Sequence, residues 1–289
     1  MLVTLRKKHL LEKLLPVSDG VICGRYFATG FDLSLDDLVD IRKECARQGR
    51  GFFICMDAFI SENERMLANE YLSFLEGLDV DGIYFHDLGV LELARSFDLS
   101  DKLIYDGKSV LCNSRDAGFL LQQGISSLVI SRELTLQEIE KIVRTHQGKI
   151  EMQIFGHLRL SYSKRKFLSN YFAQIGKDYD FFNKESLSLV EEKRDYRMPI
   201  IEDEYGTCIY TDYLFEMFSE FPGLSPYLKR GIIDTIFMED ANQIAEVCRD
   251  YRRVSMVNHE FIKESLIHNY PDLYSSAYLY QKTNITKDE

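Results

Sequence analysis

The sequence predicts an α/β protein built from repeated βα units, and two observations lead to this prediction. Apolar runs of strand length alternate six times with helical stretches and glycine-containing turns, with a repeat of about 25 to 30 residues. The runs are almost continuously apolar, as expected of strands that are covered on both faces. Such a chain forms either a (β/α) barrel or a doubly wound sheet, and periodicity alone does not separate these two folds.

Six strands and five helices are expected in the first half of the chain. The strands are Gly20–Cys23, Gly51–Met56, Gly82–Phe85, Lys102–Tyr105, Ser127–Ile130 and Lys149–Phe155. The helices are Leu35–Gln48, Glu62–Glu76, Gly89–Arg95, Ser114–Gln123 and Thr135–Thr145. Ser34 and Thr135 are expected to cap helices, because an acidic residue follows each at the third helical position. The first 20 residues are expected to form an amphipathic helix rather than a signal peptide, because Glu12 and Lys13 interrupt the apolar positions.

The repeat is interrupted after residue 156 by a segment typical of antiparallel strands. The predicted strands are Ser186–Val190, Met198–Asp203 and Thr207–Thr211, with a charged link at 191–197 and a turn at 204–206. We therefore expect a β-rich insertion over residues 180–218, within a single domain of residues 1–289. The βα pattern resumes with Gly231–Met238 and the helix Asp240–Tyr251, and the tail 258–289 is expected to pack on the barrel. These elements leave an eighth barrel strand unassigned.

Composition limits the partners and the compartment. The formal net charge of −11 argues against broad binding of a phosphate backbone, which needs a surplus of Lys and Arg on at least one face. No apolar run reaches the roughly 18 residues that a membrane span requires. The six cysteines, at positions 23, 45, 55, 112, 208 and 248, show no C-x-x-C spacing. We therefore expect reduced, buried thiols in a cytoplasmic protein.

In a barrel, side chains at the carboxyl ends of the strands converge on one site. This rule collects candidate substrate-binding residues, Arg25, Asp57, Lys108, Arg132 and Tyr162, and candidate catalytic residues, His86, Asp87, Glu133 and His157. Arg25 or Arg132 could clamp a carboxylate-bearing or planar substrate, or Arg132 and Glu133 could be structural ion pairs at the rim. His86 and Asp87 could act as a base and its orienter only if the backbone bends, because neighbours in a strand point to opposite faces.

Motifs of peptide hydrolysis are missing from the sequence. H-E-x-x-H and G-x-S-x-G are both absent, and Ser161 and Ser163 have no evident base near them in sequence. A metal site at His86, His157 and Asp57 would require the fold to bring distant residues together, so no metal site is predicted. The basic run 164–166, interleaved with Tyr162, Phe167 and Tyr171, either contacts phosphates and stacks on bases or is a solvated helix start.

Four segments carry motifs that follow one another in a fixed order. Residues 81–95 contain Asp-Leu-Gly-Val, residues 130–139 contain Arg-Glu-Leu-Thr, and residues 202–209 read Glu-Asp-x-x-Gly-Thr-x-Ile. The fourth segment, 151–169, reads EMQIFGHLRLSYSKRKFLS, with a Glu, an apolar strand, a Gly and a Ser-Tyr-Ser run. Together these segments closely resemble peptidase family U32, the collagenase-like peptidases, over about residues 20 to 215.

The resemblance implies a TIM-like (β/α) barrel, irregular or incomplete, with a β-hairpin insertion and strand ends that face a central site. Many family members hold an iron–sulfur cluster with four cysteines, and this chain has Arg159, Lys166 and Phe215 at or near three of those positions. One remaining thiol, Cys208, cannot hold such a cluster, so we expect no cofactor. The family's histidine before the signature glycine is replaced by Phe155, while His157 follows that glycine.

The same resemblance implies a peptidase-like protein that acts at the barrel mouth on a peptide or a small carboxylate substrate. Two alternatives remain open. One is a non-catalytic partner of a cluster-bearing U32 relative. The other is an accessory role in hydroxylation of RNA bases or small molecules, although the net charge disfavours RNA as a partner.

Overall fold

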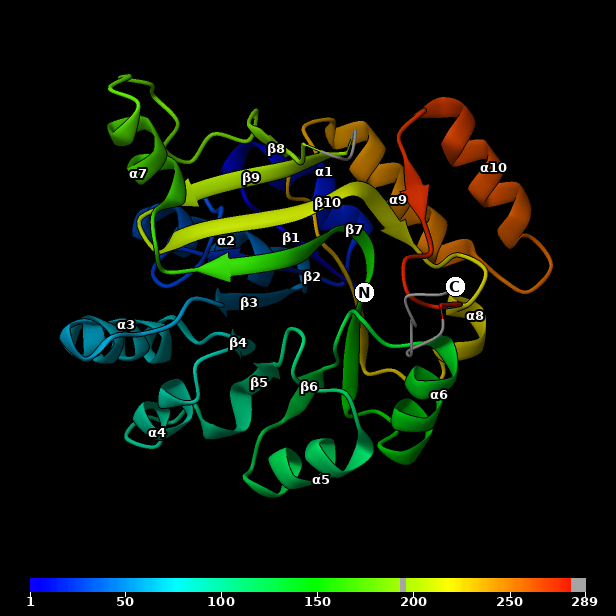
Figure 1. Ribbon diagram of the computed structural model, residues 1–289. Coiled ribbons are helices and arrows are strands. Elements are labelled where there is room, and N and C mark those ends of the chain that lie inside the picture. Colours follow the sequence, from blue (N-terminus) through cyan, green and yellow to red (C-terminus); the bar gives the residue numbers. More distant parts are fainter. Residues whose placement is uncertain (193–195, 282–289) are drawn as a thin grey trace.

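The computed structural model describes residues 1–192 and 196–281. Its centre is a closed barrel of eight parallel strands in the order β11-β1-β2-β3-β4-β5-β6-β7, with β7 paired back to β11 (Figure 1). These strands are β1 (Leu2–Thr4), β2 (Gly20–Gly24), β3 (Gly51–Met56), β4 (Gly82–Phe85), β5 (Leu103–Asp106), β6 (Ser127–Val129), β7 (Ile150–Ser163) and β11 (Arg230–Ile233). The repeat therefore encodes a barrel and not a doubly wound sheet. Parts of the predicted charged link (193–195) and tail (282–289) lie outside the described residues.

The prediction of an N-terminal helix is wrong at its start. Leu2–Thr4 form β1, which pairs with β2 on one side and with β11 on the other, and so supplies the eighth strand. Leu2 and Val3 are both buried, because neighbouring side chains point to opposite faces and here both faces are covered. A strand of three residues is too short to show a periodicity in sequence. Within the first 20 residues, the only helical structure is α1 (Leu11–Leu14) and the single turns on either side of it.

Helices cover the outside of the barrel (Figure 1). They are α2 (Leu35–Gln48), α3 (Arg65–Leu78), α4 (Gly89–Ala94), α5 (Ser114–Gln122), α6 (Leu136–Thr145) and α9 (Ala241–Arg253). Ser34 and Thr135 cap α2 and α6 in capping boxes, as predicted. In α2, Leu38 and Ile41 are fully buried against the strands, and each such side chain contributes about 1.5–3 kcal/mol to folding. No helix among the described residues is long and apolar enough to cross a bilayer.

Strand β7 belongs to two sheets. Its first part pairs in parallel with β6 and β11, and its second part pairs antiparallel with β10 (Gly206–Glu216). The change occurs at Gly156, whose φ is +109° and whose absent Cβ would lie 2.1 Å from the carbonyl oxygen of Asp234. Only glycine fits this backbone and this contact. The glycine of the signature segment therefore lets the chain leave the barrel and extend above its mouth.

The β-rich segment continues from β10 to β9 (Arg197–Asp203) and β8 (Ser188–Val190), with the predicted turn at Glu204 and Tyr205. Strand β10 extends five residues beyond the predicted end, because it also pairs with β12 (Tyr274–Ser275). Helix α7 (Phe167–Gln174) follows β7, α8 (Phe221–Leu224) follows β10, and α10 (His259–Asn269) precedes β12. The strand expected at 231–238 ends at Ile233 and is followed by a loop.

The end of the barrel opposite its mouth is closed by a polar cluster around Glu151, the first residue of the signature segment. Its carboxylate is fully buried and accepts hydrogen bonds from Tyr84 Oη (2.5 Å) and Ser127 Oγ (2.6 Å), and it pairs with Arg230 (2.5 Å). A buried charge is tolerated only when it is paired and hydrogen-bonded in this way. Glu151 therefore has a structural role, far from the strand ends that form the mouth.

Candidate functional site

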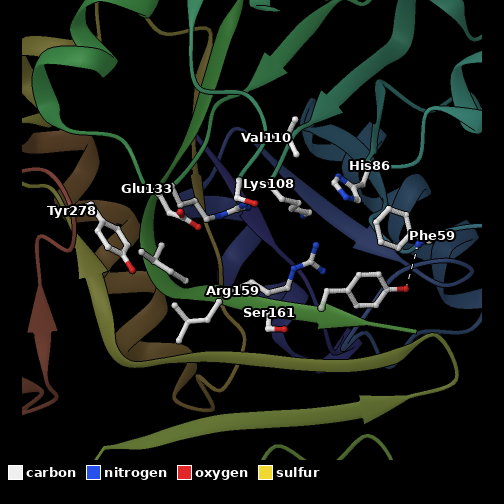
Figure 2. Close-up of a pocket in the computed structure, with 13 residues that line it drawn as sticks. Phe59, His86, Lys108, Val110, Glu133, Arg159, Ser161 and Tyr278 are labelled. Carbon is white, nitrogen blue, oxygen red and sulfur yellow. Dashed lines mark hydrogen bonds between the residues drawn. The ribbon is translucent and has the colours of Figure 1, made fainter. Parts of the chain in front are cut away.

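A cavity of about 260 Å³ opens at the carboxyl ends of the barrel strands (Figure 2). The strand ends form one wall and the extension of β7 forms the other. The lining residues are Phe59, His86, Lys108, Ser109, Val110, Arg132, Glu133, Leu158, Arg159, Leu160, Ser161, Tyr162 and Tyr278. Five predicted site residues, His86, Lys108, Arg132, Glu133 and Tyr162, are therefore brought together here. Ligands of barrel proteins bind at this end of the fold.

Two buried carboxylates below the cavity hold its cations in place. Lys108 Nζ lies 2.5 Å from Asp106 Oδ2 and 3.4 Å from Asp57 Oδ2. Arg159 Nη1 lies 2.9 Å from Asp57 Oδ2, and Asp57 also accepts the backbone N–H of Thr29 at 3.0 Å. The carboxylates therefore fix the cations as side chains with defined directions, as a binding site requires.

Arg132 is held more loosely than Lys108 and Arg159. Its Nε donates to Gln153 Oε1 at 2.7 Å, and its Nη2 lies 3.5 Å from Asp106 Oδ2. Burial alone would raise the pKa of Asp57 and of Asp106, but the charge of Lys108, with Arg159 or Arg132 next, outweighs burial and holds both pKa values well below their usual range. Both carboxylates are ionised at neutral pH. Glu133 also lines the cavity, so the formal charges of the three cations and the three carboxylates at the mouth balance.

Arg159 crosses from the β7 extension toward the strand ends (Figure 2). Its guanidinium lies over the ring of Tyr162 at 5.2 Å and within 3.9 Å of Cys208 Sγ. Burial would lower the pKa of Arg159, but Asp57 outweighs it, and the pKa is raised. Tyr162 in turn accepts the backbone N–H of Phe59 and donates to the carbonyl of Tyr205 at 3.0 Å. These contacts join the extension of β7 to the barrel.

An aromatic wall stands beside the cations. Phe59 lies 5.1 Å from the His86 ring and 5.4 Å from the Tyr162 ring, measured between centroids. His86 Nδ1 is 3.0 Å from the carbonyl oxygen of Asp106, and burial lowers the pKa of this histidine. His86 is therefore neutral at pH 7, with Nδ1 as the donor. A planar group fits between such rings and a row of cations.

Comparison with known proteins places the chain in a family. The model of peptidase family U32 matches residues 23–266. The chain belongs to peptidase family U32. It is 29% identical over 181 residues to tRNA hydroxylation protein P2 of Bacillus subtilis, covering 62% of this chain and 59% of that protein. It is 27% identical over 188 residues to a 23S rRNA 5-hydroxycytidine synthase of Escherichia coli, covering 58% of this chain and 28% of that enzyme.

The chain thus spans less than two thirds of the length of both curated relatives. Among solved structures, a U32 peptidase superposes with a TM-score of 0.51 at 14% identity, covering 81% of this chain and 91% of that one. At this identity the likeness concerns the fold alone. It agrees with the closed TIM-like barrel described above.

Three predicted site residues lie outside the U32 barrel mouth. Asp87 accepts the backbone N–H groups of Ile60 and Gly89, so it stabilises a loop and does not orient His86. His157 Nδ1 lies 2.7 Å from the carbonyl oxygen of Thr211, against β10. Arg25 pairs with Glu204 at 2.6 Å beside a second cavity. Asp57 supports the cavity from below without lining it.

Other residues of the site were missed from the sequence. Phe59 and Tyr278 line the cavity from a loop and from the C-terminal tail, and no sequence pattern points to either. The sequence places Arg159 at a family cysteine position and in a basic face with residues 164–166, but not at the barrel mouth. In a regular strand Arg159 and Tyr162, three residues apart, point to opposite faces, so no sequence pattern places the two side chains together. Asp106, by contrast, ends β5 and is predicted at the site by the same strand-end rule as Asp57.

The four-cysteine cluster of many family members does not fit the side chains found here. Arg159 is ion-paired with Asp57, and Phe215 is buried in β10. Lys166 directly precedes α7, where its ammonium group lies over the ring of Phe182 at 6.0 Å. Within residues 1–192 and 196–281, no three His, Cys, Asp or Glu side chains gather in a way that could hold a metal ion. Cys208 is buried, and burial raises the pKa of its thiol, which opposes ligation of a metal as thiolate.

Proposed function

We propose that the chain is a ligand-binding accessory subunit in the hydroxylation of RNA bases. The barrel mouth binds a small carboxylate-bearing molecule, and a second, cluster-bearing member of the U32 family supplies the redox chemistry. The observation that carries this proposal is the set of three fixed cations, Lys108, Arg132 and Arg159, beside an aromatic wall. Such a set recognises an anion, and it supplies no nucleophile.

The cations keep donors available for a ligand. Among the described residues, Arg132 Nη1 and Arg159 Nη2 make no hydrogen bond, although both guanidinium groups are anchored through other nitrogens. An anchored guanidinium with free N–H groups binds a carboxylate with little loss of conformational entropy. The neutral imidazole of His86 and the ring of Phe59 provide a surface for the planar part of such a molecule.

The link to RNA hydroxylation rests on family membership and on two of the curated relatives, which are described as a tRNA hydroxylation protein and an rRNA hydroxycytidine synthase. The assignment of an accessory role rests on Arg159, which takes the position of a cluster cysteine and is engaged by Asp57. A chain that lacks the ligands for the cluster needs a partner for redox chemistry.

The proposal is tested by deleting the gene in its native host and measuring the modified nucleosides of tRNA and 23S rRNA by mass spectrometry. A hydroxylated pyrimidine should disappear and return when the wild-type gene is restored. Co-purification from the native host should recover a cluster-bearing U32 protein. An unchanged nucleoside profile after deletion would refute the role in RNA hydroxylation.

Peptide hydrolysis is the second candidate, because the family name and the superposed structure both carry it. The mouth does not favour it. Ser161 lines the cavity, but among the described residues no hydrogen bond joins it to His86 or His157. Cleavage of a peptide library by the purified protein, lost in Ser161→Ala, would favour the peptidase interpretation over ours.

A further inference from the structure

Helix α7 and the loop after it expose an unusual number of aromatic side chains. We call residues 164–184 the aromatic arm. Of the 20 large apolar side chains that are exposed in the described part of the chain, five lie in this arm. Tyr171 and Phe182 are 56% and 53% exposed, and no residue of α7 is buried. A patch of this kind marks an interaction surface.

The aromatic arm is held in place although it buries little surface of its own. Glu202 of β9 is fully buried and accepts the backbone N–H groups of Leu168 (2.8 Å) and Ser169 (3.1 Å) at the start of α7. Thr207 Oγ1 donates to the same carboxylate at 2.7 Å. Within the arm, the ring of Phe172 stacks on those of Tyr179 and Phe181, each at 5.2 Å. The exposed rings therefore stand on a rigid support and not on a loose loop.

The aromatic arm is also basic, in contrast to the rest of the chain. It contains five Lys and Arg residues against two Asp, whereas the whole chain has a net charge of −11. Lys164 pairs with Glu64, and Lys184 pairs with Asp180. Arg165, Lys166 and Lys177 make no ion pair with any residue that the structure describes. The free cations are thus interleaved with exposed rings.

We infer that the aromatic arm binds single-stranded RNA, which deepens the proposed function and rests on it. Unpaired cations contact phosphates, and exposed rings accept unstacked bases. A protein partner is less compatible, because Lys is depleted at the centre of protein interfaces. The arm is continuous with the site, because β7 carries Arg159 and Tyr162 at the mouth and ends at Ser163, directly before the arm (Figure 1). RNA on the arm therefore lies next to the cavity.

The test measures binding of fluorescent RNA to the full chain by anisotropy. The probes are a short single-stranded RNA, a hairpin with an unpaired loop and a fully paired duplex. The wild type should prefer the first two. The double variant Arg165→Ala/Lys166→Ala should bind roughly tenfold more weakly, with a salt dependence reduced by about 1.4 in log–log slope for two lost phosphate contacts. Tyr171→Ala should also weaken binding roughly tenfold, without a change in slope.

Matched controls remove the same groups elsewhere. Lys43→Ala/Arg47→Ala deletes two exposed cations of α2, and Phe119→Ala deletes an exposed ring of α5. Both should bind RNA like the wild type. Equal binding by arm and control variants, or an arm that is needed for a protein partner but not for RNA, would overturn the inference.

The two proposals fail separately. If deletion removes a hydroxylated nucleoside while the arm variants bind RNA normally, the inference is wrong and the proposed function stands. If the arm variants lose RNA binding while deletion changes no nucleoside, the surface binds RNA and the proposed function is wrong.

Discussion

At the scale of single residues, Asp57 is the group on which the mouth depends most. It is buried at the end of β3 and joins Arg159, Lys108 and the backbone of Thr29. This largely buried carboxylate and Asp106 together hold the cations of the mouth. A buried charge that loses its partner is costly, and this gives the arrangement a measurable signature.

Replacing Arg159 by Met should lower the free energy of unfolding by about 3 kcal/mol, because Asp57 then keeps only the more distant Lys108. The double variant Asp57→Asn/Arg159→Met should be more stable than the sum of the two single changes predicts. Urea unfolding of the four proteins measures this coupling. If the losses of the two single variants simply add up in the double variant, the interaction between Asp57 and Arg159 contributes nothing to stability.

Asp203 should make stability depend on pH in the opposite sense to Asp57. Burial raises the pKa of Asp203 to about 6, although the N–H groups of Gly30 and Tyr205 oppose this. The folded state therefore holds this proton more tightly than the unfolded state, whose carboxyl titrates near its ordinary value. The resulting stability is full below about pH 4 and is lost as the pH rises through 6, by at most about 3 kcal/mol.

The measurement is urea unfolding of the wild type and of Asp203→Asn between pH 4 and 7.5. As the pH falls from 7.5 to 4, the free energy of unfolding of the wild type should rise relative to that of Asp203→Asn. Parallel profiles would show that Asp203 titrates with an ordinary pKa. Below pH 4, Asp57 and Asp106 add the reverse effect, because their lowered pKa values make the folded state lose stability as they protonate.

At the scale of elements, β7 connects the fold to the site. Its first part completes the barrel, and its second part carries Arg159 and Tyr162 over the mouth. The bend at Gly156 separates these parts. The signature segment is thus a structural device that positions the site, with Glu151 at its base and the site residues near its end.

Gly156→Ala should disrupt this bend and cost more than about 3 kcal/mol, or prevent folding, because the added methyl group meets the Asp234 carbonyl oxygen at 2.1 Å. Gly49→Ala is the matched control. Gly49 also has positive φ, at +63°, but nothing lies within 4 Å of the added atom. It should cost about 1–2 kcal/mol. Equal losses in circular dichroism and urea unfolding would show that backbone strain alone explains Gly156.

The elements that the sequence predicts best are those with a repeated pattern. Strands β2 to β6 and the capped helices α2 and α6 lie within a few residues of their predicted positions. Strand β1 was not predicted because three residues show no period. The part of β10 beyond Thr211 was not predicted because its partner, β12, lies 60 residues away in sequence. Local patterns do not encode such pairings.

The sequence predicts those site residues that stand at the carboxyl ends of barrel strands, because these ends converge on one site. The rule found His86, Lys108, Arg132, Glu133 and Tyr162, whereas Asp87, His157 and Arg25 do not line this cavity. The direction of a side chain after a strand ends depends on loop conformation, which the strand-end rule ignores. Lys108, for example, reaches Asp57 and Asp106 from a backbone with positive φ that a sequence does not reveal.

At the scale of the whole molecule, charge is distributed in two regions of function. The chain has a net charge of −11, but three cations stand at the mouth and five Lys and Arg residues lie in the aromatic arm, where we propose that a small anion and RNA bind. The formal net charge of the chain therefore hides a local surplus of cations. This distribution is expected of a subunit that brings a small molecule and an RNA base together for a partner to act on.

The most direct test of this account restores the deleted gene with variants of Arg132 and measures hydroxylated nucleosides by mass spectrometry. Arg132→Lys and Arg132→Met should fail to restore the nucleoside although circular dichroism shows both proteins folded, because neither side chain has the planar fork that binds a carboxylate. Lys43→Ala/Arg47→Ala should restore it fully. Full restoration by Arg132→Met would contradict the claim that the mouth binds the anion.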